Sequence, residues 1–367
     1  ERLLSLALLA KSFAIGFTVD AEEASRLDMS LTVIESVFLS PLLAGWGDFG
    51  IAVQAYQKRA PAVLDWAINL ARQAGRVMNI RLVKGAYWDS EIKWAQQDGL
   101  FDYPVFTRKP ATDLCYRVCA EKLLKARPDV FPQFATHNAQ TVATVLGLDD
   151  LMGANRQGFE FQRLHGMGES LYDALMAMEP VQCRIYAPVG EHKELLAYLV
   201  RRLLENGANS SFVNNIIDET IPVARLSEDP VAIVRSWADA RSGYIPLPMD
   251  LYRMSAREAG SRANAQGIDL ADDLVLNELK LEMDSFWESR PAPVAEQADA
   301  NPVLNPASGE LIGLNRFATA GEIAALIDGL RGGLTASTSG WSTTTPGERA
   351  AALRRLADLV ERDLPAL

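Results

Sequence analysis

The sequence predicts an α/β protein built on a parallel β-sheet, and three observations favour this fold class. Short apolar runs recur along the first part of the chain. After each run, apolar residues repeat at the spacing typical of an amphipathic helix. Each run also ends in polar residues. Strands that alternate with helices indicate a parallel sheet covered by helices. The predicted strands are residues 13–19, 49–53, 78–83, 131–135, 159–164 and 184–187.

Each predicted strand is followed by a predicted helix. The last helix carries Leu195, Leu199 and Leu203 on one face, and it stops at Asn206-Gly207. The earlier helices are predicted at 2–11, 30–38, 61–75, 88–96, 111–125, 139–146 and from Glu169 onward.

The strand–helix units are two fewer than a (β/α)8 barrel contains. Two architectures remain open: an open, doubly wound sheet, or a TIM-type (β/α)8 barrel whose first two units are missing from this chain. We favour the barrel, because the chain begins directly in a helical segment without an initiator methionine, a cap or a leader.

Polar residues at the strand ends are what a barrel active site requires, because such sites are built on the carboxyl ends of the strands. A plainer interpretation is that loops are polar because they contact water. That interpretation accounts for Glu22 and Glu23, but less well for Arg81, Gln54 and Gln162, which lie within otherwise apolar strands. The polar residues at strand ends are Asp20, Gln54, Lys84, Thr136, His137, Asn138, His165 and Tyr186.

Composition narrows the class of protein. The chain has 367 residues, of which 49% are hydrophobic, enough for one large core and a second, smaller unit. A net charge of -11 argues against a nucleic-acid surface or a basic membrane patch. Three cysteines make no disulfide framework, so a reducing, cytoplasmic setting is expected. No apolar run approaches the roughly 18 residues of a membrane span.

After residue 217 the strand–helix alternation stops and the composition shifts to Pro, Ser and mixed charges. We predict three segments: a partial barrel at 1–216, a linker with helices at 217–295, and the beginning of a further domain at 296–367. The linker carries predicted helices near 230–240 and 270–287. In the last segment we expect a hairpin at 301–314, followed by helices at 320–331 and 346–361.

Two adjacent arginines, Arg201 and Arg202, lie beside the apolar face of the last barrel helix. Two guanidinium groups can clamp one carboxylate in fork geometry. The alternative is a solvated pair that is held by Glu205, one turn away. Spacing alone leaves both open.

Three chemistries compete at the strand ends. A Schiff-base lyase would use Lys84 as its nucleophile. A metal hydrolase would use the three histidines, but these show no metal-ligand spacing, and we expect no metal. A bound cofactor with ring carbonyls and a diphosphate would suit the donors Arg81, Gln54 and His137, and a helix that follows Gly166–Gly168 could receive phosphate.

Long runs of sequence resemble one family closely. RLVKGAYWDSEIK (81–93), YPVFTRK (103–109), QFATHNAQT (133–141), FEFQRLHGMGE (159–169) and the stretch 184–214 are similar to the proline dehydrogenase domain of bacterial proline utilization A. The resemblance implies a distorted (β/α)8 barrel that holds FAD and oxidises L-proline to pyrroline-5-carboxylate.

The tail, 296–367, resembles the start of that family's second domain, an NAD-dependent aldehyde dehydrogenase that makes glutamate. None of the three cysteines matches the nucleophile of that domain. The resemblance therefore implies that NAD is used only by the part missing here.

The resemblance assigns roles residue by residue. Arg201 and Arg202 match the pair that holds the proline carboxylate, and Tyr186 and Tyr87 match tyrosines of the substrate pocket. Catalytic roles fall to the strand-end aspartate and to an arginine near flavin N5, which are Asp20 and Arg81. The matching FAD-binding positions are Gln54, Arg81, Lys84, Gly85, Ala86, Thr107, Lys109, Thr136, His137, Asn138, Gln162, Glu205 and Phe212.

The resemblance also implies partners and a location. A membrane quinone would accept the electrons, so a cytoplasmic protein, peripherally associated with the inner membrane, is expected. Oligomers are possible within the family, and no nucleic-acid partner is expected for this segment. Two non-enzymatic interpretations stay open: an inert folded scaffold, or a binding module for another chain.

Overall fold

The computed structural model describes residues 1–153, 155–207, 220, 222, 224, 227–237, 245–252, 264–289, 300–335 and 344–363. For residues 203–207, 287, 289 and 331–335 it describes the backbone alone. The chain divides into two compact units, Glu1–Asp272 and Asp273–Leu367. The domain boundaries that we predicted from composition stay a prediction.

A parallel six-stranded sheet forms the centre of the first unit, as the sequence predicts. Its strands lie in the same order as in the chain, which is the order of a barrel and not of a doubly wound sheet. The doubly wound alternative is therefore wrong, and the strands make a curled half-barrel. Closure of the barrel by further strands stays a prediction. The strands are β1 (Phe17–Val19), β2 (Phe49–Gln54), β3 (Met78–Val83), β4 (Val130–Ala135), β5 (Glu160–Leu164) and β6 (Cys183–Tyr186).

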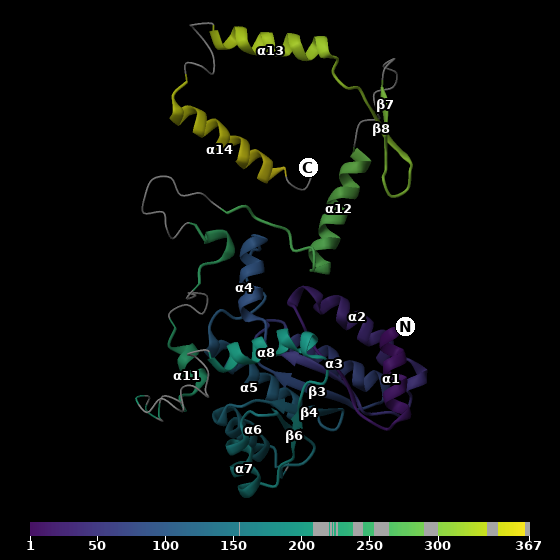
Figure 1. Cartoon of the computed structure of the whole chain (residues 1–367), viewed down its shortest axis with the longest axis vertical. Coiled ribbons are helices and arrows are strands. Elements are labelled where there is room, and N and C mark those ends of the chain that lie inside the picture. Colours follow the sequence, from purple (N-terminus) through teal and green to yellow (C-terminus); the bar gives the residue numbers. More distant parts are fainter. Residues whose placement is uncertain are drawn as a thin grey trace. The chain divides into compact units, whose positions relative to one another are not determined.

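Helices connect the strands and surround the sheet (Figure 1). Most predicted helices are confirmed with small shifts at their ends. Among the described residues of the first unit, the helices are α1 (Arg2–Ser12), α2 (Leu27–Phe38), α3 (Ala60–Ala74), α4 (Trp88–Gln97), α5 (Lys109–Lys125), α6 (Ala139–Leu151), α7 (Glu169–Met178), α8 (His192–Gly207) and α11 (Pro230–Arg235). Short 3-10 turns lie at Ala24–Arg26, Pro41–Leu43 and Pro248–Asp250.

The two faces of the sheet differ in chemistry because successive side chains of a strand point to opposite faces. In β3, Ile80 and Leu82 are buried in the core against the helices, while Arg81 between them lies on the other face. We call this second face the polar face. Its members include Thr18, Gln54, Asn79, Arg81, Gln133, Glu160, Gln162, Arg184 and Tyr186.

The predicted strand at 13–19 is wrong in its first half. The amide N–H groups of Phe13, Ala14 and Ile15 donate to carbonyl oxygens of α1, so this apolar run finishes a helix. Strand pairing begins only at Phe17, opposite Phe49 of β2. Apolar composition alone does not distinguish a frayed helix end from a short strand.

The second unit confirms the predicted hairpin and helices. Strands β7 (Asn301–Leu304) and β8 (Leu311–Asn315) are antiparallel. The Asn305 side chain accepts hydrogen bonds from the amides of Ala307 and Ser308, which shapes the turn. Helices α12 (Asp273–Ser289), α13 (Ala320–Thr335) and α14 (Pro346–Arg362) complete the unit. Within the described residues, no helix is both long and apolar enough to cross a bilayer.

Candidate active site

Three strands contribute to one cluster at the carboxyl end of the sheet. Asp20, which follows β1, forms an ion pair with Arg81 of β3. The Arg81 guanidinium carbon lies 5.4 Å from the ring centroid of Tyr186, at the end of β6. The side chain of Arg81 is 13% exposed, whereas that of Asp20 is 66% exposed. Residues that the sequence separates by more than 160 positions therefore meet at one edge.

Helix α8 brings the adjacent arginines to the same edge. Arg201 lies 5.1 Å from the ring of Tyr87, in the loop that follows β3, and Arg202 lies 5.3 Å from the ring of Tyr198. Both arginines are partly buried. Burial raises the pKa of Tyr87, and the positive charge of Arg201 opposes this rise. Arg201 is thus close enough to the β3–α4 loop to act electrostatically on it.

The apolar face from which the sequence predicts α8 is largely exposed to solvent. Leu196, Leu199 and Val200 are each more than two-fifths exposed in the described chain. The side chain of Glu205, the expected partner of the arginines, lies outside the described residues, as does Phe212.

A second cationic group follows β3 and opens α5. Lys84 forms an ion pair with Asp113, and its Nζ lies 5.9 Å from the ring of Tyr116. Burial lowers the pKa of Lys109; Asp113 opposes this effect and Lys84 adds to it. Asp113 therefore acts electrostatically on both lysines, and Thr107 lies in the loop just before Lys109. An ion-paired ammonium is not the neutral amine that a Schiff base requires.

Gly85 allows the loop after β3 to approach Tyr56 closely. Its φ is 134°, and a Cβ at this position would lie 2.4 Å from the Tyr56 ring. Only glycine meets both conditions without strain. The Tyr56 amide also donates to the Lys84 carbonyl at 2.7 Å. The loop that carries Lys84, Gly85 and Ala86 is therefore fixed by backbone contacts.

The loop after β4 orients one imidazole. His137 Nε2 accepts a hydrogen bond from the Leu164 amide at 3.1 Å, so the proton of the neutral ring lies on Nδ1. Burial, followed by the charges of Arg202 and Arg163, lowers the pKa of His137 to about 4. Its Nδ1–H is consequently a fixed donor at neutral pH.

The neighbours of His137 have structural partners. Thr136 Oγ1 accepts from the Asn138 amide at 3.2 Å, and the Thr136 carbonyl accepts from Tyr172 Oη at 2.7 Å. Asn138 caps α6 by accepting from the Thr141 amide. Both residues shape the loop, whatever further contacts they make.

Amide side chains of the polar face complete the site. Gln54 Nε2 donates to the Glu22 carbonyl at 2.7 Å. Gln162 Nε2 donates to the buried carboxylate of Glu160 at 2.8 Å, and Gln162 Oε1 is buried without a hydrogen-bond partner among the described residues. An acceptor in this state fits a ligand that carries an N–H group.

Sequence reasoning missed Asp113 at this edge, and it missed Glu160 and Gln133 further along the polar face. Asp113 lies one helical turn after Lys109, and that spacing is the signal that could have identified it. Glu160 and Gln133 alternate with apolar residues inside strands, as Arg81 does.

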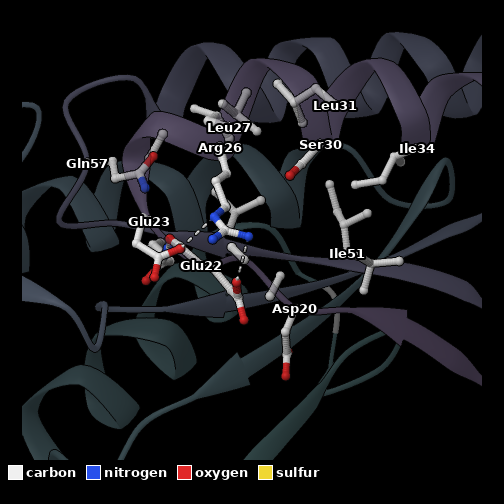
Figure 2. A pocket seen from close by; sticks show the side chains of 17 residues that line it. Asp20, Glu22, Glu23, Arg26, Leu27, Ser30, Leu31, Ile34, Ile51 and Gln57 are labelled. Carbon is white, nitrogen blue, oxygen red and sulfur yellow. Dashed lines mark hydrogen bonds and ion pairs between the residues drawn. The ribbon is translucent and has the colours of Figure 1, made fainter. Parts of the chain in front are cut away.

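A small cavity lies next to Asp20, beneath α2 (Figure 2). Arg26 spans Glu22 and Glu23 at 3.9 Å and 3.2 Å, while the Asp20 carboxylate points away from them. The volume, about 30 Å³, accommodates a water molecule and not a substrate. We therefore assign this cavity no part in ligand binding.

The donor set of the carboxyl edge fits an anionic ring cofactor. Two lysines and the Nδ1–H of His137 supply positive charge and a donor, and Gln162 supplies an acceptor. Among the described residues, no group of three or more His, Cys, Asp or Glu side chains is placed to hold a metal ion.

These features define an α/β half-barrel protein with arginine and lysine side chains gathered at the carboxyl edge of its sheet. Residues 2–215 match the model of the proline dehydrogenase family, and the chain belongs to that family. The resemblance that we noted in the sequence is confirmed.

The chain is similar over its whole length to bacterial bifunctional proteins. The chain is 46% identical over 390 residues to the bifunctional protein PutA of Klebsiella aerogenes and 45% identical over 387 residues to that of Escherichia coli K12. All of the chain is covered, but it spans 28% of the length of each relative. Proline dehydrogenase 1 of Caenorhabditis elegans is 27% identical over 215 residues, which is 57% of this chain and 34% of that protein.

Solved structures give the same result. A crystal structure of a bifunctional proline utilization A protein superposes with a TM-score of 0.83 at 46% identity, over 99% of this chain and 34% of that one. A structure of proline utilization A with proline bound in remote sites has a TM-score of 0.81 at 47% identity, over 99% of this chain and 33% of that one.

Proposed function

We propose that this chain forms the FAD- and proline-binding part of an enzyme that oxidises L-proline to pyrroline-5-carboxylate. Strand–helix units from the rest of the protein close the (β/α)8 barrel. Residues 296–367 begin an NAD-dependent dehydrogenase that oxidises glutamate semialdehyde, the hydrolysis product of pyrroline-5-carboxylate. The family match and the bifunctional PutA relatives support this assignment.

The observation that carries the proposal is the position of the arginines. Arg201 lies on the ring of Tyr87, Arg202 is close enough to lower the pKa of His137, and Arg81 lies on the ring of Tyr186. An amino-acid carboxylate entering between these rings would meet two neighbouring guanidinium groups. Such charge-assisted hydrogen bonds strengthen where water is excluded.

The residues divide the work as follows. Arg201 and Arg202 bind the carboxylate and so orient the pyrrolidine ring. Tyr87 and Tyr186 flank the pocket and exclude water. Water accepts the amine proton, since we assign no protein base. Arg81, oriented by Asp20, places a positive charge where electrons leave the substrate.

FAD, when bound, supplies the acceptor for two electrons and a proton from the substrate. The chain offers residues that suit it. Lys84 and Lys109 would hold the diphosphate, in the loop shaped by Gly85 and Ala86 and beside Thr107. His137 would donate from Nδ1, and Gln54 and Gln162 would contact the ring. Thr136 and Asn138 would hold the His137 loop, and Glu205 and Phe212 would complete the FAD shell.

We further propose a membrane quinone as the final electron acceptor and a cytoplasmic protein that reaches the inner membrane peripherally. The family resemblance supports these two assignments.

The substitution Arg202→Ala in the full-length protein tests the clamp. Loss of one charge-assisted contact of about 1.5–3 kcal/mol raises the KM for proline roughly 10- to 100-fold. Arg202→Lys is the matched control: it keeps the charge but loses the fork, so its KM lies between those of the other two. FAD content, measured by flavin absorbance, stays that of the wild type.

Unchanged kcat/KM in Arg202→Ala would refute the clamp. A purified wild-type protein that stays colourless after incubation with FAD would instead refute the flavoenzyme and favour an inert scaffold. Borohydride trapping of an adduct on Lys84 would indicate the lyase.

A further inference from the structure

One carboxylate on the polar face holds three donors at once. Glu160 is 3% exposed. Its Oε1 accepts from Gln162 Nε2 at 2.8 Å and from Gln133 Nε2 at 3.0 Å. Arg184 of β6 grips the same group in a fork, from Nε to Oε1 at 2.8 Å and from Nη2 to Oε2 at 2.9 Å. The cluster thus joins β4, β5 and β6.

The Glu160 carboxylate determines which end of the Gln162 amide, the NH2 group or the carbonyl oxygen, faces it. An ionised carboxylate accepts hydrogen bonds and donates none, so an amide that touches it must present its NH2 group. Both oxygens of the Glu160 carboxylate accept N–H bonds from the Arg184 fork. The carbonyl oxygen of Gln162 is therefore forced to the opposite side of the amide.

Gln162 Oε1 is a buried acceptor that receives no hydrogen bond from the described residues. The residue as a whole is 4% exposed. A buried acceptor in this state costs about 1–3 kcal/mol. Gln162 is paired with Arg184 in register, and the next residue on the same face of β6 is Tyr186, whose ring lies on Arg81.

We propose that Glu160 is a positioning residue: with Arg184, it locks the Gln162 amide so that Oε1 faces the site as an acceptor for an N–H group of a bound heterocycle. This inference rests on the proposed function, in which the heterocycle is the flavin ring. The imide N–H is the one N–H that an oxidised flavin ring offers. Glu160 acts through Gln162 and does not itself touch the ligand.

A thermodynamic cycle on FAD affinity tests this coupling. Full-length apoprotein is titrated with FAD for the wild type, Glu160→Gln, Gln162→Leu and the double variant. A glutamine at 160 offers a carbonyl or an NH2 group and no longer dictates how Gln162 is turned. Loss of one hydrogen bond weakens FAD binding by about three- to tenfold in each single variant. If Glu160 acts through Gln162, the double variant binds FAD no more weakly than Gln162→Leu alone.

A spectrum separates positioning from a purely structural role. The absorption band of bound oxidised flavin responds to hydrogen bonds at the ring, so Glu160→Gln should share the band shape of Gln162→Leu. Glu160→Met removes the carboxylate while keeping a side chain of similar length, and it replaces Glu160→Gln in the cycle if that variant fails to fold.

Two outcomes would overturn the inference. Effects of Glu160→Gln and Gln162→Leu that multiply in the double variant would show that Glu160 only braces the sheet. A wild-type spectrum retained in Glu160→Gln would do the same. If the wild-type protein binds no FAD, both the proposed function and this inference are overturned. If it binds FAD but the two substitutions weaken FAD binding independently, only the inference is overturned.

Discussion

The two ends of the sheet hold their arginines differently. At the carboxyl end, Arg201 lies against the ring of Tyr87, and Arg81 lies against that of Tyr186 while pairing with a single exposed carboxylate, Asp20. At the amino end, Arg156 bonds Asp149, Asp150 and Glu179. These bonds, led by the one from Asp150, raise the pKa of Arg156.

The two ends differ in how much of the guanidinium charge their neighbours neutralise. An aromatic ring attracts a guanidinium group without neutralising it, whereas carboxylates cancel its charge. The amino end contains a fully buried carboxylate, Asp149, between Arg127 and Arg156. That end ties together the loops before β4, β5 and β6, so it serves stability. At the carboxyl end, Arg201 lies on an aromatic ring, and we expect its charge to remain available to an anionic ligand.

The largest effect is expected at the amino end. Asp149→Ala removes the carboxylate that Arg127 Nη1 and the Arg156 amide contact at 3.0 Å and 2.8 Å. Breaking a buried pair by removing one partner costs about 3–5 kcal/mol. Urea unfolding should show this loss while the KM for proline of the remaining folded protein stays unchanged.

Asp150→Ala is the control, because its side chain is 64% exposed and an exposed pair contributes about 0–1 kcal/mol. Equal losses in the two variants would contradict the distinction between the buried and the exposed carboxylate.

An intermediate effect is expected from His137, where the cationic edge acts on a titratable group. The pKa of His137 is about 4 in the folded chain, because of burial and then Arg202 and Arg163. The unfolded chain binds this proton below about pH 6.5, so stability falls as the pH drops from about 6.5 to 4. At about 1.4 kcal/mol per pKa unit, the loss is at most about 3 kcal/mol.

Denaturant unfolding between pH 4 and 7 measures this loss. His137→Gln keeps an acceptor for the Leu164 amide and carries no titratable group, so its stability should fall less over this range. If the unfolding free energies of the two proteins depend on pH in the same way, the protonation of His137 is not coupled to folding.

The smallest effect is expected at Asp20. Its side chain is 66% exposed, so Asp20→Ala should change the unfolding free energy by less than about 1 kcal/mol. Arg81 loses the carboxylate that orients it, and kcat/KM for proline should fall about tenfold, or about 1.4 kcal/mol.

Glu22→Ala is the matched control for this variant, because Glu22 is also exposed but faces Arg26. A similar fall in kcat/KM for both variants would attribute the effect to the general negative charge of the loop.

Sequence reasoning predicted the parallel sheet because its strands are apolar runs that alternate with amphipathic helices. It failed at Phe13–Gly16, since a helix end and a strand can share the same apolar composition. The residues at strand ends were identifiable because barrels place ligands there. Glu160 and Asp113 were not, since a buried carboxylate is recognised by the partners that neutralise it, and these come from other elements.

Strand β6 has a further consequence for how the site is lost on heating. It is four residues long, it pairs with β5, and it carries both Arg184, which grips Glu160, and Tyr186, which lies on Arg81. Fraying of a strand this short would release the Arg184–Glu160 fork and the Arg81–Tyr186 contact together. Amide hydrogen exchange at β6 should therefore follow the loss of ligand more closely than the loss of the whole sheet.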